Sequence, residues 1–411
     1  MIELKPTIYT LRNGIRLVYM SIPAQVAHLG VTVLAGSRYE GQKEEGLAHF
    51  LEHCIFKGTA KRRSLHILSR LDSVGGELNA YTTKEEICVH ASFSKEYTRR
   101  TSELIADIFL NSTFPLKEIE KEKEIILDEI NSYLDSTSEK IYDDFEAYLY
   151  KNHSLGTNIL GTKDSVASFS QADLKRYTEK FFFAENIVIS FVGDFPLAKL
   201  IQILEKDFGH LSRRSQIEKP STFANYEAFK IRSKEANFQT HSVIGGMAPG
   251  YDDEKRRGMT LLTNVLGGPA LNSRLILSIR EKYGYSYNIE ANYSPYADTG
   301  YWSIYFATDP KYLEKTIKLV YKEIRLMREK ALNETQLKNA KIQLKGHLSL
   351  SLDSNSGIML GLGKSLLLFN QIDSIQEVYD GIDKLSVKDL QEIAEEYFDE
   401  SKLSELIYEL E

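Results

Sequence analysis

The segment His49-Phe50-Leu51-Glu52-His53 contains two histidines four positions apart, with a glutamate directly before the second. In an α-helix, residues at this spacing project from one face, so both imidazoles can bind one metal ion. Glu52 lies on the same face, where its carboxylate can reach a water that the metal activates. Gly58 provides a helix stop soon after the motif. The pattern therefore predicts part of a catalytic zinc site on a short helix.

A zinc hydrolase needs a third protein ligand and one coordination position for water. The acidic segment 116–133 is typical of a helix, and several of its carboxylates compete for this role. Glu118, Glu122 and Glu129 fall on one stripe, because steps of four and seven residues return to nearly the same angle. Apolar residues 125–127 indicate a buried helix end, where a carboxylate is costly unless it is paired or bound to metal. Glu129 is therefore the first choice as ligand, and Glu122 is the next candidate or an outer partner.

Three segments resemble the pitrilysin/insulinase family of zinc peptidases, in which H-x-x-E-H is the inverzincin order. They are GLAHFLEHCIFKGT at 46–59, GGELNAYTTKE at 75–85 and EKEKEIILDEI at 120–130. The likeness is closest to short-chain members, which include the mitochondrial processing peptidases and their bacterial relatives. The resemblance implies one zinc ion per chain, with His49, His53 and Glu129 as ligands. It also implies Glu52 as the general base and Glu122 as a second important glutamate.

The segment 266–287 resembles a second family signature, in which an arginine and a tyrosine seven positions later help to bind substrate. These positions are Arg280 and Tyr287, and Tyr283 and Tyr285 are nearby competitors. A guanidinium and a phenol can hydrogen-bond a peptide carbonyl or the oxyanion that forms beside the metal. In long-chain members the metal domain faces the fourth domain. The resemblance therefore implies a homodimer in which each chain supplies Arg280 and Tyr287 to its partner.

The segment 78–82 has strand character and contains Asn79 and Ala80. If it forms a sheet edge, an extended peptide can add to it as a further strand through backbone hydrogen bonds. Asn79 and Ala80 are therefore predicted substrate-binding residues. This mode of binding selects extended chains and rejects folded proteins.

Length and composition are those of an ordinary globular protein. A chain of 411 residues is too long for one ordinary core and predicts two domains of about 200 residues. The net charge of −7 argues against nucleic acid as a partner, because phosphate binding needs clustered Lys and Arg. The two cysteines, Cys54 and Cys88, provide no disulfide framework. No apolar run suits a membrane span or a signal peptide, so we expect no membrane partner and a cytoplasmic location.

The chain has the features of a diverged internal duplication. Two S-x-x-D helix starts, at Ser170 and Ser386, lie 216 residues apart. The acidic helix has a counterpart near 337–350, and the segment 256–268 takes the place of the zinc helix but contains no histidine. We therefore predict a zinc-bearing domain at 1–212, a linker at 213–222 and a homologous domain without metal at 223–411.

Each half mixes strands with long helices, which predicts an α+β fold. Strands are expected at 27–34, 87–93, 187–192, 240–246 and 302–308. Helices are expected at 97–111, 116–135, 171–182, 311–329 and 333–348. The grouping favours a largely antiparallel sheet with helices packed on one face, and the resemblance implies this architecture twice, with two chains closing around a chamber.

These features predict a zinc-dependent endopeptidase that hydrolyses peptides or unfolded segments inside a closed chamber. One alternative is a non-catalytic peptide-binding or assembly subunit of the same fold. Another is a zinc hydrolase with a substrate other than a peptide.

Overall fold

The computed structural model describes residues 5–214, 220–236 and 238–410, and their contacts divide the chain into two compact units. The first unit contains the described residues of Met1–Asn131, Thr157–Pro220 and Ser351–Ser374. The second contains Ser132–Gly156 and the described residues of Ser221–Leu350 and Ile375–Glu411. The predicted continuous domains, 1–212 and 223–411, therefore each include one segment that packs with the other unit. Residues 215–219 of the predicted linker lie outside the described residues.

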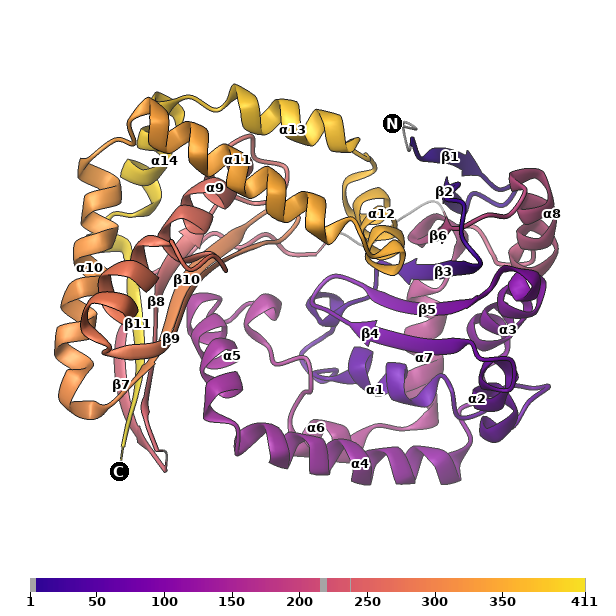
Figure 1. Ribbon diagram of the computed structural model, residues 1–411. Coiled ribbons are helices and arrows are strands. Elements are labelled where there is room, and N and C mark those ends of the chain that lie inside the picture. The colour runs from indigo at the N-terminus through magenta and orange to yellow at the C-terminus, as the bar shows by residue number, and fades with distance from the viewer. Residues whose placement is uncertain (1–4, 215–219, 237, 411) are drawn as a thin grey trace. The chain divides into compact units, whose positions relative to one another are not determined.

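The sheet of the first unit has six strands in the order β1-β2-β6-β3-β5-β4. They are β1 (Thr7–Thr10), β2 (Arg16–Met20), β6 (Ile187–Val192), β3 (Val26–Val33), β5 (Ile87–Ser94) and β4 (Glu77–Thr82). Only the β2–β6 pair is parallel, so the prediction of a largely antiparallel sheet is confirmed. β4 forms one edge of this sheet (Figure 1).

One face of this sheet packs against most helices of the unit. These are α1 (Leu47–Cys54), α2 (Ser64–Asp72), α3 (Thr98–Asn111), α4 (Leu116–Leu134), α6 (Lys163–Ser168), α7 (Gln171–Phe181) and α8 (Leu197–Phe208). Alternate strand residues such as Leu29, Val31 and Val89 point into this core and are fully buried. The core anchors α1, which carries the two motif histidines.

The opposite face of the sheet is covered by α12 (Asn355–Phe369), which comes from the C-terminal half of the chain (Figure 1). Met359 packs with Met20 and Val192, and Leu366 packs with Val188. The prediction of helices on one face therefore omitted this second layer. A helix pattern defines an apolar stripe but does not specify which sheet the stripe covers.

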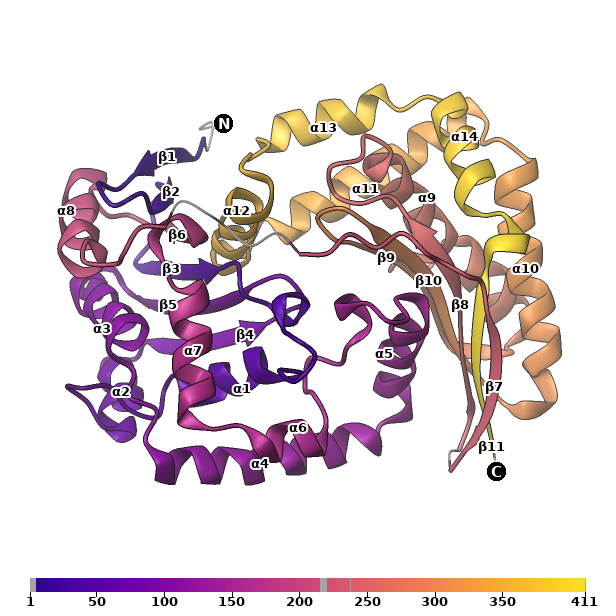
Figure 2. The same ribbon diagram turned by 180° about the vertical axis from the view of Figure 1, so that it is seen from behind.

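The sheet of the second unit has five strands in the order β7-β11-β8-β10-β9. They are β7 (Lys230–Glu235), β11 (Ser404–Leu410), β8 (Thr240–Ala248), β10 (Gly300–Thr308) and β9 (Ser286–Pro295). One face packs against helices α9 (Arg256–Gly267), α10 (Leu313–Glu329), α11 (Glu334–Ser351), α13 (Ile375–Lys384) and α14 (Val387–Tyr397). The other face is covered by α5 (Thr137–Leu149), as Figure 2 shows from behind.

The two units share one topology, as expected for a duplication. The strands β2, β6, β3, β5 and β4 correspond in order to β7, β11, β8, β10 and β9, and each set contains one parallel pair. The predicted helix starts at Ser170 and Ser386 both form capping boxes. The helices α5 and α12 follow α4 and α11 at matching places, and each packs on the sheet whose strands come from the other half of the sequence. No described helix is long and apolar enough to cross a membrane.

Because α12 covers the sheet of the first unit, we predict that a fragment of residues 1–212 is less stable than the intact chain. Without α12, this fragment exposes Val18, Met20, Val188 and Val192, and full burial of each side chain of this size is worth about 1.5–3 kcal/mol. We expect a lower urea midpoint than in the intact chain, measured by far-UV circular dichroism. Adding a peptide of residues 351–374 should raise the midpoint, and a fragment as stable as the intact chain would contradict this account of the fold.

Candidate metal centre

The two motif histidines lie on α1, as their spacing predicted. Gly46 starts the helix with a φ of 89°, a left-handed conformation that suits glycine. Phe50 and Leu51 point into the core, so the opposite face of α1 presents His49 and His53 with ring centroids 4.7 Å apart. Burial, and next the neighbouring His53, lower the pKa of His49 to about 4. The His49 imidazole is therefore neutral near pH 7, the form that binds a metal.

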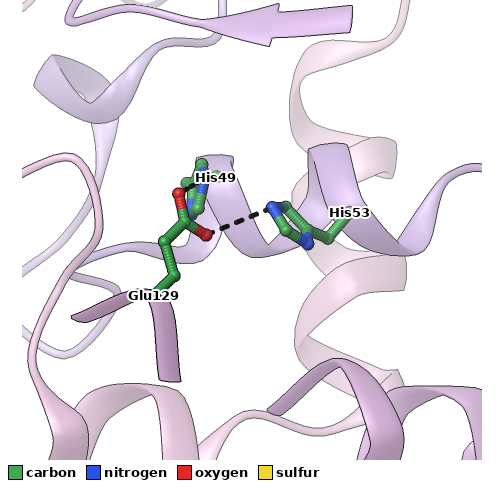
Figure 3. A group of neighbouring side chains, drawn as sticks. All are labelled: His49, His53 and Glu129. Atoms are coloured by element: carbon green, nitrogen blue, oxygen red, sulfur yellow. Dashed lines mark ion pairs between the residues drawn. The ribbon is translucent and has the colours of Figure 1, made fainter. Parts of the chain in front are cut away.

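Glu129 of α4 faces both histidines (Figure 3). Its Oε1 lies 3.8 Å from His49 Nε2, and its Oε2 lies 3.6 Å from His53 Nε2. These distances are too long for hydrogen bonds. They suit atoms that share a zinc ion, because tetrahedral bonds of about 2.0–2.2 Å hold the ligand atoms on the order of 3.4 Å apart. Two imidazole nitrogens and one carboxylate are also a donor set of catalytic zinc sites.

The Glu129 side chain is more exposed than its apolar neighbours in the sequence predicted. Its side chain is 43% exposed, whereas that of Glu122 is only 4% exposed. The apolar run before Glu129 is buried at Ile126 but exposed at Ile125. Glu129 thus lies beside the histidines, as its place on the helical stripe predicted, but the prediction that its side chain is buried was wrong.

Glu122 and Lys57 form an outer layer behind His53. Glu122 Oε2 lies 3.2 Å from His53 Nδ1, and its Oε1 lies 2.7 Å from Lys57 Nζ. Burial raises the pKa of Glu122, but the hydrogen bonds from His53 and Lys57 outweigh this effect and leave the pKa below its usual value. The carboxylate can accept a hydrogen bond from His53 Nδ1–H, which leaves Nε2 unprotonated on the side of Glu129, as outer carboxylates do in zinc sites. Sequence reasoning missed Lys57, although it lies four residues after His53.

Replacing Lys57 with methionine should weaken zinc binding about tenfold, because Glu122 would lose the cation that fixes it behind His53. Competition with a coloured chelator measures this affinity. Lys61→Met is the matched control, since Lys61 belongs to the same segment but is 65% exposed and faces Asp107. Equal zinc affinity in the two variants would exclude a role for Lys57 in the site.

Glu52 projects from the same helix and contacts β4. Thr82 at the end of β4 donates a 2.6 Å hydrogen bond to Glu52 Oε2. Burial raises the pKa of Glu52, although the Thr82 hydrogen bond opposes this shift. Thr82 fixes one oxygen of the carboxylate and leaves Oε1 for proton transfer. Sequence reasoning assigned no role to Thr82, because this contact depends on how α1 packs beside β4.

Asn79 and Ala80 lie on β4, which is an edge strand as the substrate-binding prediction required. Asn79 is paired with His90 of β5, and Ala80 with Val89. Their side chains point to opposite faces of the sheet, and Ala80 packs against the core on the side of α1. The contribution of these two residues to substrate binding stays a prediction.

Arg280 and Tyr287 contact each other in the second unit. Arg280 belongs to a π-helical turn, Ile276–Glu281, and its guanidinium carbon lies 4.4 Å from the centroid of the Tyr287 ring on β9. Tyr287 is 81% exposed, which suits a side chain available to a ligand. Tyr283 and Tyr285 instead stack on each other. The spacing of seven positions thus selected the tyrosine that contacts Arg280. The role of this pair in substrate binding stays a prediction.

Comparison with known proteins finds relatives over nearly the whole chain. Residues 16–163 match the family described as "Insulinase (Peptidase family M16)", and residues 168–344 match "Peptidase M16 inactive domain". A Bacillus subtilis protein named "Uncharacterized zinc protease YmxG" is 31% identical over 403 residues, covering 97% of each chain. This chain belongs to peptidase family M16. The Lentinula edodes mitochondrial-processing peptidase subunit beta is a further relative of this M16 chain, 32% identical over 95% of it and 87% of the relative.

Solved structures with the same fold match nearly all of the chain. A Pseudomonas fluorescens structure described as a peptidase M16 inactive domain superposes with a TM-score of 0.93 at 19% identity, covering 99% of this chain and 98% of that one. A protease from Helicobacter pylori gives a TM-score of 0.91 at 20% identity, covering 99% and 100%. At these identities the likeness establishes the α+β architecture alone. The H-x-x-E-H motif of this M16 chain lies within the insulinase match at 16–163.

Proposed function

We propose that this M16 protein is a zinc-dependent endopeptidase that hydrolyses peptides or unfolded protein segments. The observation that carries the proposal is the grouping of His49, His53 and Glu129, with one ligand atom from each within 4.8 Å of the others. Glu52 projects from the same helix and is oriented by Thr82. Zinc bound by the three side chains would polarise the scissile carbonyl and acidify the attacking water.

The other side chains of this site transfer the proton, position the ligand ring and balance charge. Glu52 accepts a proton from the attacking water through Oε1 and later gives it to the leaving amine. Glu122 fixes the His53 ring, and Lys57 balances the charge of Glu122. The edge strand β4 can take up the substrate as an additional strand beside α1, with backbone hydrogen bonds that tolerate many sequences.

Cleavage of a mixed peptide library, followed by mass spectrometry, tests this function. We expect internal cleavage of extended peptides, no cleavage of a stably folded protein, and loss of cleavage with a zinc chelator. Zinc binding without any cleavage would instead favour the non-catalytic peptide-binding or assembly subunit. The intact set of Glu52, Thr82 and the three candidate ligands favours the enzyme, because a purely structural subunit has no chemical need for a base beside a metal.

The proposal includes a cytoplasmic homodimer that encloses its substrate in a chamber. In it, each zinc site is served by the partner's Arg280 and Tyr287, whose guanidinium and phenol can hydrogen-bond the substrate or the developing oxyanion. The support is the contact between these two residues and the exposure of Tyr287, together with the resemblance to short-chain relatives.

Mixing two inactive variants tests the shared site. One chain carries Glu52→Gln, and the other carries Arg280→Ala with Tyr287→Phe. With random subunit exchange, half of the dimers are mixed and each contains one intact site, so we expect about a quarter of the wild-type activity. Mass spectrometry of the intact dimers provides the control for exchange. No recovery despite demonstrated exchange would mean that the pair acts within its own chain or not at all.

A further inference from the structure

Glu40 connects the loop before the zinc helix to the first turn of that helix. Its Oε1 accepts the N–H of Ala48 at 2.7 Å, and its Oε2 accepts the N–H of Gly46 at 2.9 Å. The N–H groups of a first helical turn have no partner within the helix, so the two Glu40 oxygens satisfy donors that would otherwise be unpaired. Burial raises the pKa of Glu40 to about 8, and these two hydrogen bonds oppose that shift. Ala48 directly precedes His49, so Glu40 fixes the backbone from which this candidate ligand projects.

Close packing confines the same helix start from a second side. A Cβ atom on Gly46 would lie 2.7 Å from both Gly161 Cα and the Leu160 carbonyl oxygen. This separation is too short for a real contact, so only glycine fits here. The start of α1 therefore has little room to shift once Glu40 is in place.

The first part of the connection before α1, the loop 36–40, packs against the turn 83–86 between β4 and β5. The backbone N–H of Ser37 donates a hydrogen bond to the Thr83 carbonyl oxygen at 3.1 Å, and the N–H of Arg38 donates one to the Lys84 carbonyl oxygen at 2.7 Å. A Cβ atom on Gly36 would lie 2.4 Å from Glu85 N, so glycine is needed for this approach. Arg38 and Glu85 form a 2.9 Å ion pair whose side chains are 0% and 4% exposed. A buried pair of this kind is costly to break, which makes the docking rigid.

The turn 83–86 directly follows β4, so these contacts form a closed ring around the site. Thr82 of β4 donates to Glu52, while the loop 36–40 runs from the turn to Glu40 and so back to the start of α1. The zinc helix is thus connected to β4 at two points, one beside His49 and one at the proposed base. Catalytic groups need this kind of support, because a displacement of about 1 Å can cost ~10²-fold in rate.

We infer that Glu40 is a positioning residue, which fixes the zinc helix against β4 and so sets the geometry of His49 and Glu52. The inference rests on the proposed function of the zinc site. In Glu40→Gln, the amide keeps one acceptor oxygen and turns an NH₂ group toward the second N–H. We expect zinc affinity about tenfold lower and kcat about tenfold lower, with KM nearly unchanged. In the metal-free protein, we expect faster hydrogen exchange in residues 46–50.

Glu44→Gln is the matched control. Glu44 lies between Glu40 and α1, but its carboxylate accepts the N–H of Gly41 and pairs with Arg176. This variant should keep the zinc affinity, kcat and exchange rates of the wild type. Equal values in the two variants, or a lower melting temperature of Glu40→Gln with unchanged zinc affinity and kcat, would overturn the inference. If Glu40→Gln fails to fold, Glu40→Asp takes its place under the same criteria.

The zinc-affinity and exchange measurements do not depend on peptidase activity, so the two hypotheses can fail separately. A wild-type protein that binds zinc but cleaves no peptide refutes the proposed function, and the Glu40 comparison still decides the positioning role. If the wild type shows chelator-sensitive cleavage and Glu40→Gln keeps the wild-type zinc affinity, kcat and exchange rates, only the positioning role is refuted.

Discussion

Replacing Glu52 with glutamine is expected to lower kcat for peptide cleavage by about 10²–10⁴-fold, the range that loss of a positioned general base allows. The amide keeps the shape of the side chain and can still accept the 2.6 Å hydrogen bond from Thr82. It cannot accept a proton from the attacking water. Zinc content should remain at the wild-type level, because Glu52 is not one of the three grouped ligand residues.

Two controls make this result specific. Metal analysis and the melting temperature of the Glu52→Gln protein should match the wild type, which excludes unfolding or metal loss as the cause. The kcat of Thr82→Val should lie between the values of the wild type and of Glu52→Gln, because this change removes the hydrogen bond that orients Glu52 but leaves the carboxylate. A Glu52→Gln protein with normal kcat would show that another group takes the proton.

Replacing Glu129 with glutamine should act by a different route and remove zinc itself. A residue that binds the metal directly contributes more to zinc affinity than a residue that only contacts a ligand. The loss of affinity should therefore exceed the ~10–100-fold that such outer partners contribute. Activity should then follow zinc occupancy and return partly at high zinc concentration. Glu122→Gln should lower the affinity within the smaller range, because Glu122 contacts His53 on the nitrogen that faces away from Glu129.

The control for Glu129 lies on the same helix. Glu120 is 71% exposed and pairs with Lys123, so Glu120→Gln should leave both zinc binding and activity unchanged. Normal zinc affinity in Glu129→Gln, with a large loss in Glu122→Gln, would reverse the two assignments and make Glu122 the ligand.

The sequence predicted the parts of the site that depend on spacing within a helix. His49 and His53 share a face because they are four residues apart, and the stripe through Glu122 and Glu129 brings both carboxylates to the same side of α4. The α+β class and the repeated helix starts were predicted for a similar reason, since strand alternation and capping residues are read within short segments. These features are local, and local periodicity is sufficient to predict them.

The remaining contacts depend on tertiary packing and could not be predicted in this way. Lys57, Thr82 and Glu40 contact the site through elements that are distant in sequence or lie outside the helix. The exchange of α5 and α12 was missed because an apolar helical stripe does not identify its sheet. The exposure of Glu129 was missed because apolar neighbours in sequence need not cover the same side of a helix.

Zinc titration of the metal-free protein tests the central claim most directly. The chelated protein should be inactive toward an internally quenched peptide. Activity should rise with added zinc and reach its plateau at one zinc ion per chain, the number that the single described group of His49, His53 and Glu129 allows. Full peptidase activity in the verified metal-free protein would contradict the account.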